Sequence, residues 1–292
     1  MKIAVVGLGL IGGSLAKALK AHTLHKVGGY DQNPDVLAKA MADGAADDIV
    51  EDSFAGWDMV LISLYPADTI AFLEKFRDSF SPGTLIVDMC GVKTAVCRRG
   101  RELFAGTGVD FLGGHPMAGR ECSGYDNAQP ELFRGASMIL TPEKDFPIQR
   151  LEDAESLFLS LGFGRMTLTT PQHHDEVIAY TSQLAHVVSS AYMQSPTAEE
   201  YMGFSAGSFG DLTRVAKLNE VMWSELFLAN AGPLVEQIDN VQANLTRFRA
   251  LIADGKQEEL QEQLRKGCLL KEKVEIEQNE QKGAGRSWNS SR

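Results

Sequence analysis

Three side chains in the second and third quarters of the chain are suited to act together on one anionic substrate: His115, His186 and Arg214. Imidazole titrates near neutral pH, so each histidine can accept or donate a proton under working conditions. A guanidinium can hold a carboxylate through two parallel hydrogen bonds. Each residue also has a structural interpretation: a loop histidine, a core histidine, and an ion pair of Arg214 with Asp211. At this point both a catalytic and a structural role stay open for each of the three residues.

The adjacent pair His173-His174 and the acid Asp175 open the first helix of the second half. A carboxylate at a helix start is favoured by the helix dipole and accepts hydrogen bonds from free N–H groups, so we interpret Asp175 as a capping residue. Two adjacent histidines cannot both ligate one ion well, and no cluster has metal-ligand spacing. We therefore predict no metal site. The sequence also offers no G-x-S-x-G elbow of a serine hydrolase.

The clearest binding motif is a G-x-G-x-x-G turn at residues 7–12, which follows a short apolar strand over residues 1–6. In such a turn the first glycine allows a tight bend, the second leaves room for a pyrophosphate, and the third lets the next helix pack closely. The phosphates then sit on the free N–H groups at the start of that helix. The residues that we predict to bind a dinucleotide here are Gly7, Gly9, Leu10, Ile11 and Gly12.

An acidic residue decides which dinucleotide is expected. A second apolar strand over residues 26–30 ends at Asp31, where the ribose-binding acid of such folds belongs. Its carboxylate can accept hydrogen bonds from the ribose hydroxyls and would repel a 2′-phosphate, and no arginine is adjacent, so NAD is favoured over NADP. Ser63 and Tyr65 follow a further strand at the same edge and are predicted to complete the cofactor site.

The first half of the chain alternates strands with helices, which is typical of an α/β, Rossmann-type doubly wound parallel sheet. Ligands of such sheets bind outside the carboxyl ends of the strands, where the loop after Asp88 and the segment around His115 both fall. Besides the two strands above, the expected strands are 57–63, 84–88, 109–112, 135–141 and 164–169, and the expected helices are 34–43, 66–80, 93–104 and 148–161.

The second half contains almost no strand signal and long stretches with helical periodicity. We expect three parts: an NAD-binding domain over 1–170, a helical domain over 171–281 and a disordered Gly/Ser/Arg-rich tail over 282–292. One helical face in the second part is marked by residues at three- and four-residue intervals, namely Val177, Tyr180, Thr181, Leu184 and Val188.

The composition restricts the class of protein. The formal net charge of −11 argues against a nucleic-acid surface and against attraction to anionic membranes. No apolar run approaches the roughly 20 residues that span a bilayer, and the glycines of the N-terminal turn argue against a secretion signal. The four cysteines have no C-x-x-C spacing and are interpreted as reduced thiols of a cytoplasmic protein; they are Cys90, Cys97, Cys122 and Cys268.

Taken together, the motifs resemble the prephenate/arogenate dehydrogenase family of tyrosine biosynthesis. They are the glycine turn, D-x-x-x-V-K from Asp88, H-P-M-A-G from His115, H-D…S-x-x-x-H from His174 and D-x-T-R…W from Asp211. The resemblance covers roughly residues 1–255. It implies NAD-dependent oxidative decarboxylation of prephenate to 4-hydroxyphenylpyruvate, and a homodimer that forms through the helical domain.

The resemblance also implies roles for single residues. His115 would accept the hydrogen bond of the substrate hydroxyl, Arg214 would bind a substrate carboxylate, and His186 would line the pocket. Acids associated with gating of that pocket fall at Glu121 and Asp211. Two further positions fall at the substrate in the same way, Lys93 and Gln183.

Two departures from the family pattern leave the substrate open. Gly91 stands where a serine is common, and Gln183 stands where a histidine is common in the substrate-selective wall. Arogenate is therefore the alternative substrate. A different NAD-dependent hydroxyacid dehydrogenase with a helical second domain is a further alternative, although Asp211 stands where its catalytic lysine would be. A non-enzymatic NAD-binding protein is the third alternative, and it would not need His115 and Arg214 in one cleft.

Overall fold

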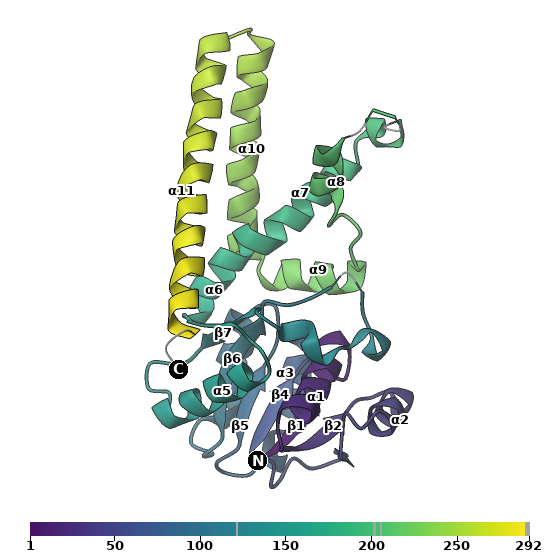
Figure 1. The fold of residues 1–292 in the computed structure, drawn as a ribbon. Coiled ribbons are helices and arrows are strands. Elements are labelled where there is room, and N and C mark those ends of the chain that lie inside the picture. Colours follow the sequence, from purple (N-terminus) through teal and green to yellow (C-terminus); the bar gives the residue numbers. More distant parts are fainter. Residues whose placement is uncertain (121, 201–202, 205, 290–292) are drawn as a thin grey trace. The chain divides into compact units, whose positions relative to one another are not determined.

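The apolar runs of the first half form the strands of a single sheet in the computed structural model, which describes residues 1–120, 122–200, 203–204 and 206–289, without the side chains of 278–289. The strand order is β3-β2-β1-β4-β5-β6-β7-β8 (Figure 1). The central strands are buried on both faces, as expected for parallel strands covered by helices. The strands are β1 (Lys2–Val6), β2 (Lys26–Tyr30), β3 (Asp48–Ile49), β4 (Met59–Ile62), β5 (Leu85–Asp88), β6 (Asp110–Pro116), β7 (Ser137–Thr141) and β8 (Arg165–Leu168).

Helices cover both faces of this sheet, so the doubly wound fold is confirmed. Alternate residues of one strand enter opposite cores: Val5 of β1 packs with Leu15 and Phe158 on one face, and Val6 packs with Phe72 and Phe104 on the other. The helices of the first face are α1 (Leu10–His22), α2 (Pro34–Ala42) and α5 (Ile148–Ser160), and those of the second are α3 (Pro66–Lys75) and α4 (Thr94–Phe104).

One strand departs from the expected parallel arrangement. β7 pairs with β6 in the antiparallel sense, and β8 then pairs parallel with β7. The reason lies in the connection after β6, which forms two short 3₁₀ turns, η2 (Tyr125–Asn127) and η3 (Pro130–Phe133), against α1. The described residues of this connection contain no long crossover helix that would carry the chain back, so β7 starts beside the end of β6. A third 3₁₀ turn, η1 (Arg77–Ser79), follows α3.

The segment after β8 is helical in its described residues, as the periodicity predicted. It begins with α6 (Pro171–Ile178), a single π-helical turn η4 (Ala179–Gln183) and α7 (Leu184–Met193). The remaining elements are η5 (Pro196–Glu199), α8 (Gly207–Thr213), α9 (Glu220–Ala229), α10 (Ala231–Ala253) and α11 (Gln257–Asn289). Within the described residues, none of the helices is both long enough and apolar enough to cross a membrane.

The buried face of α6 is not the one marked by the apolar spacing. Val177 and Tyr180 are 42% and 63% exposed. The buried residues of α6 are instead Pro171, His174, Asp175 and Ile178, two of which are polar. Polar side chains can occupy a buried face only when hydrogen bonds satisfy them, so a hydrogen-bond network must lie beneath this helix.

By the density of its contacts, the chain divides into two units, Met1–Leu234 and Val235–Arg292. The first unit contains the sheet and the helices up to α9. The second contains most of α10 and the whole of α11, which runs to Asn289 and so continues beyond position 282, where we expected a tail to begin. The boundaries proposed from the sequence for the NAD-binding and helical domains stay a prediction.

Candidate active site

The glycine turn of β1 and α1 has the geometry of an anion site. Gly7 adopts a φ of +79°, and its N–H donates to the carbonyl of Tyr30 at 2.8 Å, which joins the turn to the end of β2. A Cβ on Gly12 would lie 1.9 Å from the carbonyl oxygen of Gly7, so only glycine allows α1 to start this close to the strand. The first turn of α1 carries no acidic residue and Gly9 gives it no side-chain cap, so its N–H groups are available to a phosphate.

Asp31 lies beside this turn, as the sequence predicted for a ribose-binding acid. Its Oδ2 accepts from the N–H of Leu8 at 2.7 Å, and its Oδ1 accepts from the N–H of Asn33 at 2.9 Å. A carboxylate has about four acceptor positions, so two remain for ribose hydroxyls. The hydroxyl of Ser63 is buried against Gly7 and Gly12 without a partner among the described residues, which leaves a donor for a bound group. These residues fit NAD.

His115 lies in β6 itself and not in a loop after it. The strand continues to Pro116, and His115 pairs in register with Ile139 of β7. The preceding glycines looked like loop residues in the sequence, but packing requires them: a Cβ on Gly113 would lie 2.3 Å from Oγ1 of Thr141 and 2.4 Å from Sγ of Cys97. The histidine is therefore held by paired backbone on a rigid element.

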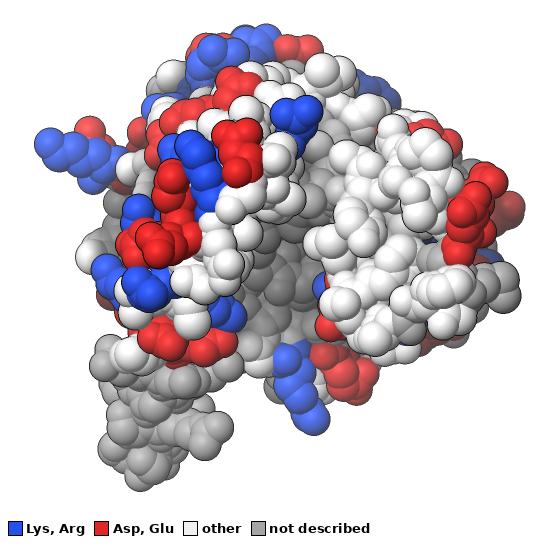
Figure 2. All heavy atoms as spheres, turned by 90° about the horizontal axis from the view of Figure 1, so that it is seen from above, with Lys and Arg blue, Asp and Glu red and all other residues white. Residues whose placement is uncertain are grey.

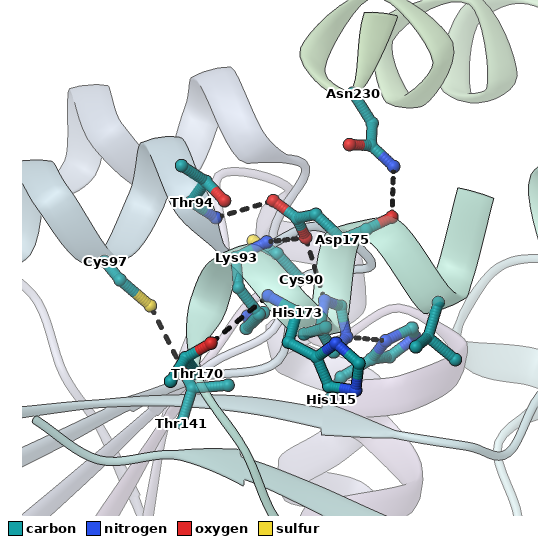
Figure 3. A network of polar contacts seen from close by, with 12 residues as sticks. Cys90, Lys93, Thr94, Cys97, His115, Thr141, Thr170, His173, Asp175 and Asn230 are labelled. Carbon is teal, nitrogen blue, oxygen red and sulfur yellow. Dashed lines mark hydrogen bonds and ion pairs between the residues drawn. The ribbon is translucent and has the colours of Figure 1, made fainter. Parts of the chain in front are cut away.

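A line of hydrogen bonds connects His115 to α6 and α4. Nδ1 of His115 lies 2.8 Å from Nε2 of His174, and Nδ1 of His174 lies 2.8 Å from Oδ1 of Asp175. The two carboxylate oxygens of Asp175 accept the backbone N–H groups of Lys93 and Thr94, each at 2.8 Å (Figure 3). Asp175 thus caps a helix, as predicted, but the helix is α4; the hydroxyl of Thr170 caps α6.

The surroundings set the charge of this line. Burial lowers the pKa of His115 well below 6.5, and the neighbouring His174 and Lys93 lower it further. Burial also lowers the pKa of His174, although its hydrogen bond to Asp175 opposes the shift. Burial acts to raise the pKa of Asp175, but the hydrogen bonds from His174, Thr94 and Lys93 outweigh it and hold the pKa below its usual value. Two neutral imidazoles next to a carboxylate are the state that the site favours at neutral pH.

Lys93 has a different partner from the one that we expected. Its side chain is completely buried and its ammonium forms an ion pair with Oδ1 of Asp88, at the end of β5. Burial opposes the charge, but Asp88 holds the pKa of Lys93 above its usual value. Burial raises the pKa of the nearby Cys97 to about 12, so this thiol stays protonated. Lys93 therefore stabilises the loop after β5, and its predicted contact with the substrate stays a prediction.

Gln183 is also committed to internal contacts. It is buried in the π-helical turn, where its Nε2 donates to the carbonyl of Leu226 at 3.1 Å and its Oε1 accepts from Nδ2 of Asn230 at 2.7 Å. The same Asn230 nitrogen donates to the backbone carbonyl of Asp175 at 2.8 Å (Figure 3). Gln183 and Asn230 thus join α6 to α9 and stabilise the helix that carries His174 and Asp175.

His186 lies on α7, where its ring stacks on Trp223 of α9 with the centroids 3.8 Å apart. Its Nδ1 lies 2.8 Å from the carbonyl of Ser182, so Nδ1–H donates there and Nε2 is left as an acceptor. One turn after Trp223, Leu226 approaches the loop after β5. A Cβ built on Gly91 would lie 3.3 Å from Leu226 and 3.9 Å from Nε2 of His115. Nε2 of His115 therefore faces the space between the β5 loop and α9.

The structure gives fewer contacts for the remaining residues predicted for the site. Arg214 follows directly after α8, which packs on α7, and Arg214 and Asp211 are both exposed. Glu121 lies outside the described residues. Tyr65 is 39% exposed at the start of α3, next to the N–H of Ala67, which donates to the carboxylate of Glu225 at 2.7 Å. That last bond ties α9 to the first turn of α3.

Sequence reasoning missed the roles of His174, Asn230 and Thr94. His174 was paired with its neighbour His173 as a helix-start residue, yet His174 is buried and His173 is exposed. The available signal was the spacing of residues 171, 174, 175 and 178, which places a histidine and an acid on one helical face with Pro171 and Ile178.

A dinucleotide turn with a ribose-binding acid, and a neutral histidine at the same edge of a doubly wound sheet, define the class of NAD-dependent dehydrogenases. Comparison with known families agrees. Residues 15–166 match the family described as prephenate dehydrogenase, nucleotide-binding domain, and residues 170–266 match prephenate dehydrogenase, dimerization domain. The chain belongs to the prephenate dehydrogenase family, and it is an NAD-dependent oxidoreductase.

Similar proteins span nearly the whole chain. A cyclohexadienyl dehydrogenase from Zymomonas mobilis is 33% identical over 263 residues, which is 86% of this chain and 88% of that protein. The solved structure of A. aeolicus prephenate dehydrogenase, in complex with hydroxyphenyl propionate and NAD+, gives a TM-score of 0.82 at 28% identity and covers 96% of this chain and 98% of that chain. Synechocystis arogenate dehydrogenase gives a TM-score of 0.81 at 28% identity, covering 94% of this chain and 100% of that chain.

Proposed function

We propose that this protein is a prephenate dehydrogenase that converts prephenate to 4-hydroxyphenylpyruvate and CO2, with NAD as the hydride acceptor. The observation that carries the proposal is the orientation of His115: Nδ1 contacts His174, and Nε2 faces the space beside Gly91 at the carboxyl edge of the sheet. A neutral imidazole nitrogen at that place can accept the hydrogen bond of a substrate hydroxyl. As that hydroxyl loses its proton, the carbon that bears it can release a hydride.

The remaining groups bind and enclose the substrate in this proposal. Arg214 holds a carboxylate of the substrate, for which a guanidinium has the matching geometry. His186 and Trp223 stack to form one wall, and Nε2 of His186 is available to a polar atom of the ligand. Glu121 and Asp211 gate the entrance. At the cofactor end, Gly7, Gly9, Leu10, Ile11 and Gly12 bind the phosphates, Asp31 binds the ribose, and Ser63 and Tyr65 complete the site.

Prephenate is favoured over arogenate by the state of the nearby acids. The two substrates differ where the keto group of one is an ammonium in the other, and a buried ammonium needs an anionic partner. Among the described acids around His115, Asp88 pairs with Lys93 and Asp175 accepts from His174, Lys93 and Thr94. Oδ2 of Asp88 is buried without a partner among the described residues, but the charge of Asp88 is already balanced by Lys93, and both oxygens of Asp175 accept hydrogen bonds inside the protein.

The test is a comparison of kcat/KM for prephenate and arogenate, measured by NADH formation with the purified protein. A panel of 3-hydroxy acids serves as the control for the wider class of hydroxyacid dehydrogenases. We expect prephenate to be the preferred substrate. A kcat/KM for arogenate that is tenfold or more above that for prephenate would overturn the choice of substrate and leave the reaction type intact.

We further propose a homodimer that forms through the helical segment. Exposed apolar side chains gather on α6–α9, and Figure 2 shows a broad area of uncharged residues on its right, on the side where Figure 1 places α7–α9. An apolar area of this kind on a soluble enzyme is typical of a subunit interface. The side chains concerned are Val177, Tyr180, Tyr192, Met193, Leu212, Val221 and Leu228.

The domain limits and the location of the protein are proposed in the same way. An NAD-binding domain over 1–170 and a helical domain over 171–281 are supported by the two matched family descriptions. A cytoplasmic location is supported by the cysteines, all four of which are free thiols. The cysteines Cys90 and Cys97 are in addition buried.

A further inference from the structure

The direction of each hydrogen bond between Asp175 and His115 follows from the chemistry of its atoms. An ionised carboxylate can only accept, so Nδ1 of His174 must carry the proton in its contact with Asp175. A neutral imidazole has one donor and one acceptor, which makes Nε2 of His174 the acceptor. Nδ1 of His115 must then donate to it across the 2.8 Å contact, and Nε2 of His115 is left unprotonated.

We propose that His174 is a positioning and proton-accepting residue for His115, anchored by Asp175, and that the three side chains form a reversible proton store for the dehydrogenation. The inference rests on the proposed function, because it assumes that the substrate hydroxyl lies at Nε2 of His115. Asp175 fixes the tautomer of His174, and His174 in turn fixes the tautomer of His115. The geometry is that of a catalytic triad in which a second histidine is inserted.

The overall reaction takes up the same proton that it first removes from the hydroxyl. That proton must therefore be held in the site and not passed to solvent. When hydride leaves the ring carbon for the bound NAD, the O–H bond breaks and the ring oxygen forms a carbonyl. The O–H proton passes to Nε2 of His115, and the Nδ1 proton of His115 passes to Nε2 of His174. Loss of the ring carboxylate as CO2 then sends its electron pair through the ring to that oxygen. The phenolate takes a proton back from Nε2 of His115, and the proton on Nε2 of His174 returns to Nδ1 of His115. Both imidazoles are then neutral again, and no proton is released overall.

The surroundings suit a proton store in which His174 and Asp175 are shielded from solvent. After the forward step, His174 is a cation next to the carboxylate of Asp175, whose two oxygens also accept from the first N–H groups of α4. Asp175 is 4% exposed and His174 is 2% exposed. The charged groups that face the two imidazoles are Asp175 from α6, Lys93 from the start of α4 and Asp88 from β5. The ammonium of Lys93 opposes a resident proton, which favours its return to the product.

Two variants separate the parts of the store. In Asp175→Asn, the amide can donate to Nδ1 of His174, which reverses both tautomers and leaves a proton on Nε2 of His115. We expect kcat to fall by about 10²–10⁴, the range for a wrong tautomer or a lost acid–base group, with KM little changed. In His174→Gln, the amide oxygen still accepts from Nδ1 of His115 but cannot take its proton. The loss of kcat should be smaller, and the acid limb of the kcat/KM profile should move up toward pH 6.5, because His174 contributes to lowering the pKa of His115.

The matched control is His173→Gln. This neighbouring histidine is exposed and lies 3.5 Å from Glu176 across one helical turn, outside the store. The substitution His173→Gln should leave kcat, the pH profile of kcat/KM and the tautomers of His115 and His174 unchanged. A direct readout without turnover is the ¹⁵N spectrum of ring-labelled histidine, in which His115 should carry its proton on Nδ1 in the wild type and on Nε2 in Asp175→Asn.

Failure of the proton store can be distinguished from failure of the proposed function. If the wild type oxidises neither prephenate nor arogenate, the proposed function fails, and the ¹⁵N spectra still test the tautomers. If the wild type turns over while His174→Gln keeps its kcat and its acid limb, the proton store is wrong and the function stands. Binding of NADH, followed by fluorescence, and the melting temperature report whether each variant folds. Loss of activity with an unchanged His115 tautomer in Asp175→Asn would also overturn the proposal.

Discussion

Nδ1 of His115 lies 2.8 Å from Nε2 of His174, and this contact directs the other nitrogen of His115 toward Gly91 and Leu226. One residue belongs to a strand of the sheet and the other to the first helix after it. The orientation of the His115 ring is therefore set by a residue of the helical segment, so that, in the proposed reaction, a change in that segment can alter the chemistry without touching the substrate.

Replacing His115 by Asn should remove the acceptor for the substrate hydroxyl. We expect kcat to fall by about 10²–10⁴ with KM little changed, because a positioned acid–base group acts mainly in the transition state. Steady-state kinetics at saturating NAD measure both constants, and an unchanged affinity for NADH shows that the fold is intact. Full turnover by this variant would mean that His115 is not the acceptor.

Arg214→Gln should act on substrate binding instead. A charge-assisted hydrogen bond to a carboxylate contributes about 2 kcal/mol, so KM for prephenate should rise roughly 30-fold with a smaller effect on kcat. The control is Arg265→Gln, which removes an exposed arginine that pairs along α11 with Glu262. If KM is unchanged in Arg214→Gln, the carboxylate is bound by another residue.

Asp31→Ser should weaken the preference for NAD over NADP. The change removes acceptors for the ribose hydroxyls and a charge that would repel a 2′-phosphate. The ratio of kcat/KM for the two cofactors measures the effect. An unchanged ratio would place the ribose elsewhere. Asp35→Ser, in the first turn of α2, is the control for a nearby acid.

Mild acid should destabilise the folded protein. The pKa values of His115 and His174 are lowered by burial in the folded state, whereas an unfolded histidine titrates near 6.5. Their contribution to stability is therefore complete above pH 6.5 and is lost as the pH falls from there toward the lowered pKa values, by up to about 1.4 kcal/mol per pH unit for each histidine. Urea unfolding between pH 7.5 and 5 measures the slope, which should be shallower in His174→Gln and unchanged in His173→Gln.

A charge on the exposed face of η4 should separate the subunits. Tyr180 is 63% exposed, and Tyr180→Glu places a carboxylate in the apolar area of the helical segment. Sedimentation velocity should show a dimer for the wild type and a monomer for this variant. Ile148→Glu, which changes an apolar residue on α5 that is 74% exposed, should stay dimeric. Wild-type sedimentation for Tyr180→Glu would place the interface elsewhere.

The sheet could be predicted from the sequence because its signals are local. Strand β4, for example, is an apolar run between polar ends, and the glycine turn after β1 specifies both a bend and a ligand. The direction of β7 could not be predicted, since it depends on how the connector packs on α1. The two-residue strand β3 has no pattern of its own and forms only by pairing with β2.

The polar contacts of the site could not be predicted because they join distant parts of the chain. Asp175 was recognised as a cap, but the helix that it caps begins 81 residues earlier, at Thr94. His174 and His115 are separated by 59 positions, and Gln183 and Asn230 by 47. Lys93 and Gln183 were assigned to the substrate by resemblance, and that role stays a prediction; the contacts that their polar groups make inside the protein could not be read from the sequence.

The π-helical turn η4 determines how a change in the number of residues between α6 and α7 would act on the site. It holds one residue more than an α-helical turn would, between the helix that carries Asp175 and the helix that carries His186. Deleting a single residue there would restore a regular helix, and α7 would keep almost the same rotation, because the wider π-helical turn covers about the same angle with one residue more. The ring of His186 should then stay against Trp223. A one-residue insertion has no such compensation and would rotate everything after it by about 100°. One-residue deletions between positions 179 and 183 should therefore be better tolerated than one-residue insertions.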